Sequence, residues 1–223
     1  MGRVLEYLDA HNLADSTLVI YTSDQGMLFG EHDYWDKRWI YEESIRMPFL
    51  ARLPNVIPSG KVSEELVMNL DLAPTLLEFA GAPVPDDMQG RSFLTHQLDP
   101  ARTRGRDAVY YRYWMHMAHH QVPAHYGIRT RSHKLAFFYG LPLDASGAIP
   151  EPTPAYFELY DLSRDSLEMN NVYDDPEYAA TREDLKHQLL RIKEQIGDSD
   201  ERYDELMRVR AEVWNRRAGP AKQ

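Results

Sequence analysis

The stretch TLVIYTSDQGMLFGEHDYWDK, residues 17–37, joins a hydrophobic strand pattern to a polar end that can carry chemistry. Its first residues are mostly β-branched, aliphatic or aromatic, which predicts a buried strand over Thr17–Ser23. Asp24, Gln25 and Gly26 follow at once, and a glycine permits the sharp turn that ends such a strand. Because ligands of α/β sheets bind at the carboxyl ends of strands, the stretch predicts a functional site here.

The segments around this stretch predict an α/β arrangement. Residues 3–13 have the apolar spacing of a helix, and a second apolar run covers Met47–Leu53. Asp71 is the predicted N-cap of a helix that ends near Phe79, with Gly81 as its stop. Helix, strand, loop, strand and helix in this order are typical of an α/β layer. Two strands are few for a doubly covered parallel sheet, so we expect the rest of it outside this sequence.

The pattern changes near residue 100. Four segments rich in β-branched and aromatic residues predict a small antiparallel sheet: Ala108–Trp114, Tyr126–Thr130, His133–Tyr139 and Ala155–Leu162. Residues 176–217 then predict one or two helices. We therefore divide the chain into residues 1–100, part of an α/β core, and residues 101–223, an α+β subdomain with an antiparallel sheet and flanking helices.

Composition excludes several classes of function. The chain has 223 residues, of which 43% are hydrophobic, so it can bury a real core. Its net charge of −10 argues against nucleic acid as a partner, since phosphate binding requires a basic surface. No apolar run is long enough to span a membrane, and the polar N-terminal residues do not resemble a signal peptide. The absence of cysteine excludes disulfides, thiol catalysis and thiolate zinc sites.

The residues after the predicted strand suit a site for an anionic group. The Asp24 carboxylate and the Gln25 amide are hard oxygen ligands of the kind that Ca²⁺ or Mg²⁺ prefers. Lys37 can neutralise an oxyanion, and His32 can donate to the same group or carry a proton. The alternative is structural: Asp24 caps the next element, Gly26 makes the turn, and Lys37 is a solvated loop lysine.

An ordered series of motifs resembles the type I sulfatase family of the alkaline-phosphatase-like superfamily. The matching residues are Thr22–Gly26, Gly30–His32, Trp35, Lys37, Tyr41–Ser44, Arg46–Phe49, Asn69–Leu77, Gly90–Ser92, Gly127–Thr130, Lys134–Leu135 and Glu158–Leu162, out to Asn171. The resemblance covers nearly the whole chain to about residue 196. It implies the C-terminal part of a sulfatase core followed by a smaller subdomain.

The resemblance also implies roles for individual residues. Asp24 and Gln25 correspond to ligands of a single Ca²⁺, and Lys37 corresponds to the lysine that contacts the substrate sulfate. His32 matches a motif histidine near the pocket. The amide at Gln25 favours the sulfatases over the two-metal phosphatases, in which histidine would suit zinc.

Two parts of the family's catalytic apparatus are absent from this sequence. The formylglycine of sulfatases arises from a Cys/Ser-x-Pro-x-Arg motif, but the chain has no cysteine and no serine followed two residues later by proline. Asp9 and Asp15 precede the strand and are not the family's two early aspartate ligands. We therefore expect the chain alone to be inactive and to associate with an N-terminal sulfatase half or with itself. The resemblance suggests a periplasmic, secreted or lysosomal location.

The segment around His125 and Arg129 resembles glycan-directed sulfatases, including the N-acetylglucosamine-6-sulfatase and mucin-desulfating groups. This implies that His125 and Arg129 contact a sulfated carbohydrate; the alternative is a hairpin histidine and a structural arginine. His116, His119, His120 and His125 are close in sequence, but their loop setting argues against a zinc site. We expect Arg46 to pair locally with Glu42 and Glu43.

Three hypotheses for function follow. The first is a sulfatase segment whose parent activity is hydrolysis of a sulfate ester, on a sulfated sugar. The second is a non-catalytic protein that binds glycans or partner chains. The third is a phosphodiesterase or phosphonate hydrolase of the same superfamily, which Gln25 argues against.

Overall fold

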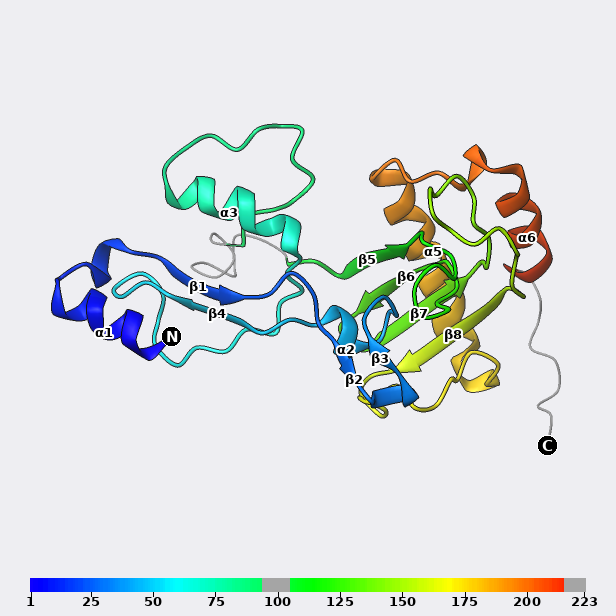
Figure 1. Cartoon of the computed structure of the whole chain (residues 1–223), viewed down its shortest axis with the longest axis horizontal. Helices are drawn as coiled ribbons and strands as arrows, with labels where there is room; N and C mark the ends of the chain where they lie inside the picture. The colour runs from blue at the N-terminus through cyan, green and yellow to red at the C-terminus, as the bar shows by residue number, and fades with distance from the viewer. Residues whose placement is uncertain (94–104, 215–223) are drawn as a thin grey trace. The chain divides into compact units, whose positions relative to one another are not determined.

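The computed structural model describes residues 1–93 and 105–214, which form two compact units (Figure 1). The first comprises Met1–Gly26 and Arg46–Arg106, and the second comprises Met27–Ile45 and the chain from Asp107 onward. Our predicted boundary at residues 100 and 101 lies outside the described residues. The segment Met27–Ile45 belongs to the second unit, although it lies in the part of the sequence that we assigned to the core.

The first unit contains a two-stranded antiparallel sheet and two helices. Strand β1 (Val19–Thr22) pairs with β4 (Phe49–Arg52), so that Val19 faces Arg52 and Thr22 faces Phe49. Helix α1 (Gly2–Ala10) precedes β1, and α3 (Leu72–Phe79) follows β4. The predicted strands are confirmed, but they are antiparallel neighbours of each other, and no parallel pair occurs among the described strands.

Helix α3 begins and ends where the sequence predicts. Asp71 is its N-cap, and Gly81, with a φ of 67°, follows its C-cap. The Gly81 amide donates to Glu78, and the next amide donates to Leu77 at 2.9 Å, as in a Schellman motif. The buried Asp71 carboxylate does not cap the helix itself; it accepts bonds of 2.8 Å from the amides of Met68 and Arg91.

The second unit is built on a four-stranded antiparallel sheet of order β5-β6-β7-β8, which confirms the predicted sheet. Its strands are Ala108–Tyr113, His125–Thr130, His133–Phe138 and Tyr156–Asp161. Two helices follow, α5 (Ala179–Gln195) and α6 (Asp204–Trp214). Short 3-10 turns cover Ala14–Ser16 and Asn69–Asp71 in the first unit. In the second unit they cover Glu31–Asp33, Pro176–Tyr178 and Asp200–Arg202.

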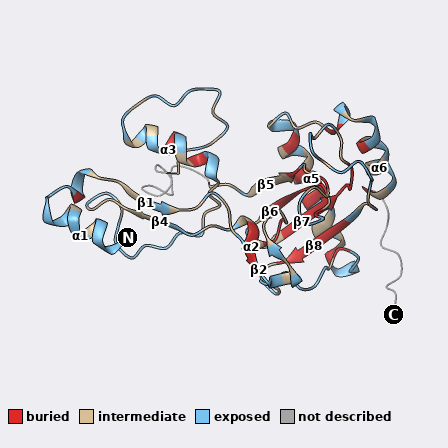
Figure 2. Cartoon of the chain, in the orientation of Figure 1, coloured by how far each residue is buried: buried red, intermediate tan, exposed pale blue. Residues whose placement is uncertain are grey.

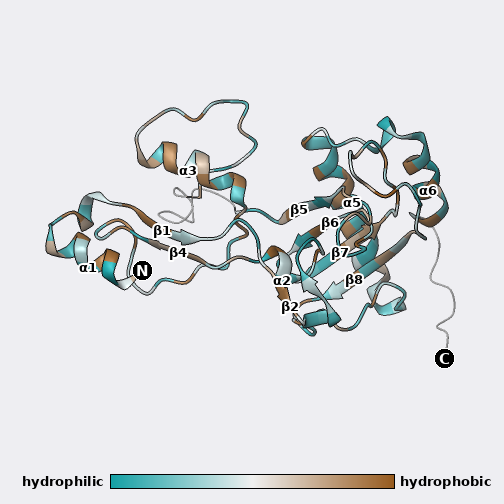
Figure 3. Ribbon diagram, in the orientation of Figure 1, coloured by the Kyte–Doolittle hydropathy of each residue, from teal (hydrophilic) through white to brown (hydrophobic). Residues whose placement is uncertain are grey.

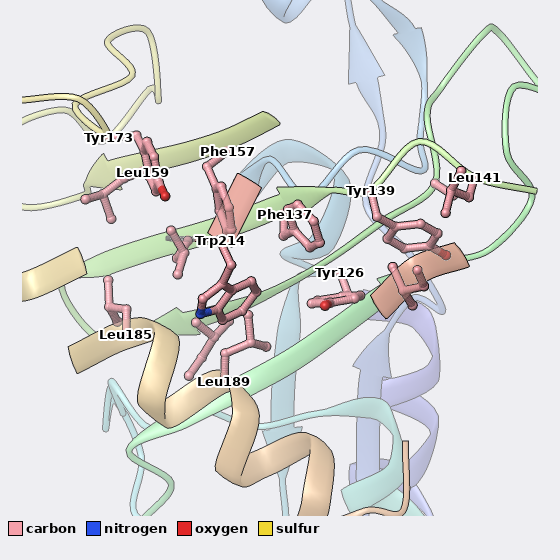
Figure 4. Packing of buried hydrophobic residues seen from close by; sticks show 14 of the residues in the cluster. Tyr126, Phe137, Tyr139, Leu141, Phe157, Leu159, Tyr173, Leu185, Leu189 and Trp214 are labelled. Atoms are coloured by element: carbon pink, nitrogen blue, oxygen red, sulfur yellow. The ribbon is translucent and has the colours of Figure 1, made fainter. Parts of the chain in front are cut away.

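Helices α5 and α6 cover one face of this sheet and enclose the main hydrophobic core. Leu185 and Leu189 of α5 are buried against the sheet, and the Trp214 ring of α6 meets the rings of Phe137 and Phe157 (Figure 4). Buried residues concentrate on the strands of this sheet (Figure 2). Apart from the residues that face the core, helix α6 is mostly hydrophilic (Figure 3). The helices predicted within residues 176–217 are confirmed.

The opposite face of the sheet is covered by the segment Met27–Ile45. It contains β2 (Leu28–Phe29), which pairs with β3 (Trp35–Asp36), and the short helix α2 (Glu42–Ile45). Ile40 is fully buried against β6 and β7 because Gly127 lacks a side chain there. A Cβ at Gly127 would lie 2.5 Å from Ile40 Cδ1 and 2.4 Å from the Leu135 carbonyl oxygen.

Among the described residues, no helix combines the length and apolar character needed to cross a membrane.

Candidate functional site

The turn after β1 is fixed through its main chain. Asn69 Nδ2 donates to the Asp24 carbonyl oxygen at 2.6 Å, and Ser23 Oγ donates to the Gln25 carbonyl oxygen at 3.0 Å. Asp24 is exposed and Gln25 is half-buried. Since these two bonds use backbone oxygens, they hold the turn without engaging the Asp24 carboxylate. Asn69 lies 45 residues away in sequence, and our sequence analysis assigned it no role.

The donor set at this turn suits Ca²⁺ in kind but not in number. A carboxylate and an amide oxygen are hard ligands, whereas Ca²⁺ takes six to eight oxygens. The described part of the chain holds no group of three or more His, Cys, Asp or Glu side chains that could bind a metal ion. Asp24 and Gln25 therefore form no complete calcium site among these residues.

His32 and Lys37 lie in a loop with unusual backbone geometry. His32 and Asp33 have φ values of 54° and 55°, and Asp36 and Arg38 have φ values of 119° and 98°. Non-glycine residues seldom adopt positive φ, and such strained positions concentrate at functional sites. The loop that carries two of the predicted site residues thus contains four non-glycine residues with positive φ between positions 32 and 38.

His32 is held by an aromatic stack. Its ring lies 3.9 Å from the Tyr41 ring, with only 8° between the planes. Its Nε2 atom is 3.8 Å from a carboxylate oxygen of Glu43, and only 12% of its side chain is exposed. The imidazole is therefore fixed in orientation, which suits a residue that donates to one defined group.

Tyr41 links this stack to a buried carboxyl group. Its hydroxyl donates to Glu158 of β8 at 3.3 Å. Burial raises the pKa of Glu158 to about 7, with a smaller contribution from the neighbouring charge of Glu168. Glu158 is consequently largely protonated below neutral pH, and sequence reasoning did not identify it as a candidate site residue.

A buried ion-pair network fixes helix α2 to the sheet. The Lys134 ammonium lies 2.6 Å from Glu168 and 3.0 Å from Glu42, and Arg129 donates to both oxygens of Glu42 at 3.2 and 3.1 Å. Burial alone would raise the pKa of Glu42, but the charges of Lys134 and Arg129 lower it to about 2. The expected local pairing of Arg46 with Glu42 is therefore wrong, because Glu42 pairs with Arg129 of β6 and Lys134 of β7.

The residues predicted to bind sugar lie within the second unit. The His125 ring is fully buried and packs beside the Phe138 ring, with 4.6 Å between the centroids and 31° between the planes. Its Nδ1 is 2.8 Å from the Pro123 carbonyl oxygen, and burial lowers its pKa to about 4, so the ring is neutral. Arg129 is engaged by Glu42. Contact of His125 or Arg129 with a substrate remains a prediction.

The neighbouring histidines have different surroundings. His116 is fully buried; its Nδ1 accepts from the Ala124 amide, and its Nε2 lies 3.1 Å from the Glu151 carbonyl oxygen. Both nitrogens are used to shape the loop before β6. His120 is half-exposed and approaches Asp36, with 3.2 Å between Nε2 and Oδ2. These contacts give both histidines structural partners.

The predicted site residues fall on both units. Asp24 and Gln25 belong to the first unit, whereas Lys37, His32, His125 and Arg129 belong to the second. Within the second unit, one layer of side chains on the outer face of the sheet includes His32, Tyr41, Trp39 and His125. A single pocket shared by Asp24, Gln25 and Lys37 remains a prediction.

Comparison with known proteins identifies the family. The family described as "N-sulphoglucosamine sulphohydrolase, C-terminal" matches residues 30–195. The chain belongs to this sulfatase family. It is 41% identical over 202 residues to an N-acetylglucosamine-6-O-sulfatase of Bacteroides thetaiotaomicron, covering 90% of this chain and 34% of that protein.

Solved structures agree with this assignment. A structure described as a complex with its substrate D-glucosamine-2-N,6-O-disulfate matches with a TM-score of 0.78 and 42% identity, covering 89% of this chain and 38% of the other. A phosphonate monoester hydrolase of Agrobacterium radiobacter matches with a TM-score of 0.69 and 26% identity, covering 87% and 38%. The chain thus spans little more than a third of the length of these relatives.

Proposed function

We propose that the chain is the C-terminal part of a sulfatase that hydrolyses a sulfate ester on an amino sugar of the N-acetylglucosamine-6-sulfate type. The observation that carries this proposal is the 41% identity to an N-acetylglucosamine-6-O-sulfatase over 90% of the chain. The similar structure holding a glucosamine bearing N- and 6-O-sulfates supports the same class of substrate.

On this proposal, Lys37 and His32 are the residues of the second unit that act on the sulfate group of the substrate. The Lys37 ammonium neutralises the negative oxygens of the sulfate group, which gain charge when the ester bond breaks. His32, oriented by Tyr41 and Glu43, donates to the same group or transfers a proton. His125 and Arg129 shape the sugar side of the site from β6.

Asp24 and Gln25 would supply two of the ligands of a bound Ca²⁺, which balances the charge of the sulfate. The remaining ligands and the formylglycine nucleophile would come from residues outside this sequence. The antiparallel pair β1–β4 would likewise form part of a larger α/β core. On this proposal, residues 1–223 alone do not turn over a sulfate ester.

A hybrid enzyme tests the proposal. In the Bacteroides thetaiotaomicron relative, the matching 202-residue segment is replaced by the corresponding residues of this chain. We expect this hybrid enzyme to release sulfate from N-acetylglucosamine-6-sulfate and from 4-nitrophenyl sulfate. Lys37→Ala should lower kcat/KM for either substrate by at least ~100-fold, the scale of losing a preorganised charge contact.

Controls separate this proposal from the alternatives. Arg191→Ala changes an exposed residue of α5 and should leave turnover unaltered. A folded hybrid that cleaves a phosphonate monoester but no sulfate ester would favour the alternative function of a phosphonate hydrolase. A folded hybrid without any turnover would favour a non-catalytic binding protein. Either result would overturn the proposed function.

A further inference from the structure

The loop that carries Lys37 is anchored on both sides of that lysine. Asp36 precedes it and Arg38 follows it, and the side chains of these two residues form an ion pair across it. Both have positive φ values, so the backbone is held away from its preferred conformations on each side of Lys37. Such a conformation persists only where surrounding contacts determine it.

Those contacts come from three other parts of the second unit. The Arg38 amide donates to Ser44 Oγ at 3.1 Å, and the Arg38 carbonyl accepts from the Tyr111 hydroxyl at 3.0 Å. Ser44 belongs to α2 and is fully buried, and Tyr111 belongs to β5. His120 approaches the Asp36 carboxylate, with 3.2 Å between Nε2 and Oδ2.

The ion pair is better suited to holding the loop than to binding a ligand. The Asp36 and Arg38 side chains are only 16% and 24% exposed, and their charges compensate each other. A lysine side chain is long and flexible, and loses much rotamer entropy when it is fixed. Restraining the backbone on both sides of Lys37 narrows the region that its ammonium can reach.

We propose that Asp36 and Arg38 are positioning residues for Lys37. Their ion pair, together with the hydrogen bonds that Ser44 and Tyr111 make with the Arg38 main chain, fixes the backbone from which the Lys37 ammonium reaches the sulfate group. This inference rests on the proposed function for its chemical purpose. The anchoring itself is a property of residues 36–38 and of their contacts within the second unit.

A double-mutant cycle in the hybrid enzyme tests the dependence on Lys37. If Arg38 acts through Lys37, Arg38→Ala should lower kcat/KM for 4-nitrophenyl sulfate by ~10-fold or more, but by less than ~2-fold when Lys37→Ala is already present. A purely structural role would give the same loss in both backgrounds and would overturn the inference. Arg191→Ala is the matched control and should change neither background.

Amide hydrogen exchange tests the restraint of residues 36–38 by these contacts, which we call the clamp, and it does not require turnover. In residues 1–223, Arg38→Ala and Ser44→Ala should each accelerate amide exchange of residues 36–38 by about tenfold, because local opening becomes easier. Arg191→Ala should not. Unchanged exchange in both variants would overturn the clamp, even in an active hybrid. An inactive hybrid with accelerated exchange would reject the proposed function and retain the clamp.

Discussion

The Lys134 ammonium lies 2.6 Å from the Glu168 carboxylate, and both side chains are almost completely buried. Removing one partner of a buried ion pair leaves an uncompensated charge and typically costs about 3–5 kcal/mol. We therefore expect Lys134→Met to lower the free energy of unfolding of residues 1–223 by this amount, measured by urea denaturation.

The partner substitution distinguishes this cause from a loss of packing. Lys134→Met combined with Glu168→Gln removes one of the two carboxylates that the lysine compensates. The double variant should recover part of the lost stability. If the double variant is less stable than Lys134→Met, the charge argument is wrong.

The raised pKa of Glu158 predicts a loss of stability as the pH rises. The unfolded side chain ionises near 4.5, whereas burial keeps the folded one protonated up to about 7. The folded state thus binds an extra proton between these values, and its stability falls as the pH rises through them. The difference between the folded and unfolded pKa corresponds to on the order of 3 kcal/mol of stability, at about 1.4 kcal/mol for each pKa unit.

Glu158→Gln tests this assignment, since an amide can still accept from Tyr41 but does not ionise. The variant should gain stability relative to the parent chain as the pH rises from 4.5 to 7. Thermal unfolding at several pH values measures the difference. A constant difference across this range would show that Glu158 does not titrate as described.

His125 should act in the opposite direction. Burial lowers its pKa from 6.5 to about 4, so the unfolded chain binds a proton that the folded chain rejects. The stability contributed by neutral His125 is complete above pH 6.5 and is lost as the pH falls through about 4.

His125→Phe keeps an aromatic ring beside Phe138 but removes the titration. Relative to the parent chain, this variant should become progressively more stable as the pH falls from 6.5 to 4. The same urea denaturation series measures it. A difference that does not vary with pH would place the His125 ring in a more solvated setting than the structure gives it.

Local sequence signals predicted the elements that depend on local chemistry. The four strands of the second unit follow aromatic and β-branched runs, and α3 lies between Asp71 and Gly81 as expected. These features depend on backbone preferences within a few residues. These elements could therefore be predicted without any knowledge of tertiary contacts.

The parts that were missed depend on distant partners. The packing of Met27–Ile45 against the sheet of the second unit requires the space that Gly127 leaves for Ile40, about ninety residues away in sequence. Glu42 pairs with Arg129 and Lys134, which belong to β6 and β7, and no local pattern marks such pairs. The hydrogen bond from Asn69 to the Asp24 carbonyl oxygen was also missed, because hydrogen bonds between loops produce no periodic pattern in the sequence.

The two-stranded sheet of the first unit exposes an apolar cross-strand pair. Tyr21 and Leu50 are register partners of β1 and β4, and they are 49% and 65% exposed. Phe49, the neighbour of Leu50 in β4, is 38% exposed. Exposed apolar side chains on a short sheet with unpaired edges favour association with another chain. We therefore expect residues 1–223 to self-associate as concentration rises, or to bind the remainder of a sulfatase core.

Sedimentation velocity over a range of concentrations measures this association. Leu50→Lys places a charge in the pair and should shift the chain toward the monomer. Val62→Lys adds the same charge at a position that is 87% exposed and belongs to neither strand, and should leave association unchanged. The prediction is wrong if the parent chain stays monomeric throughout, or if both variants weaken association equally, since the effect would then follow net charge and not the Tyr21–Leu50 surface.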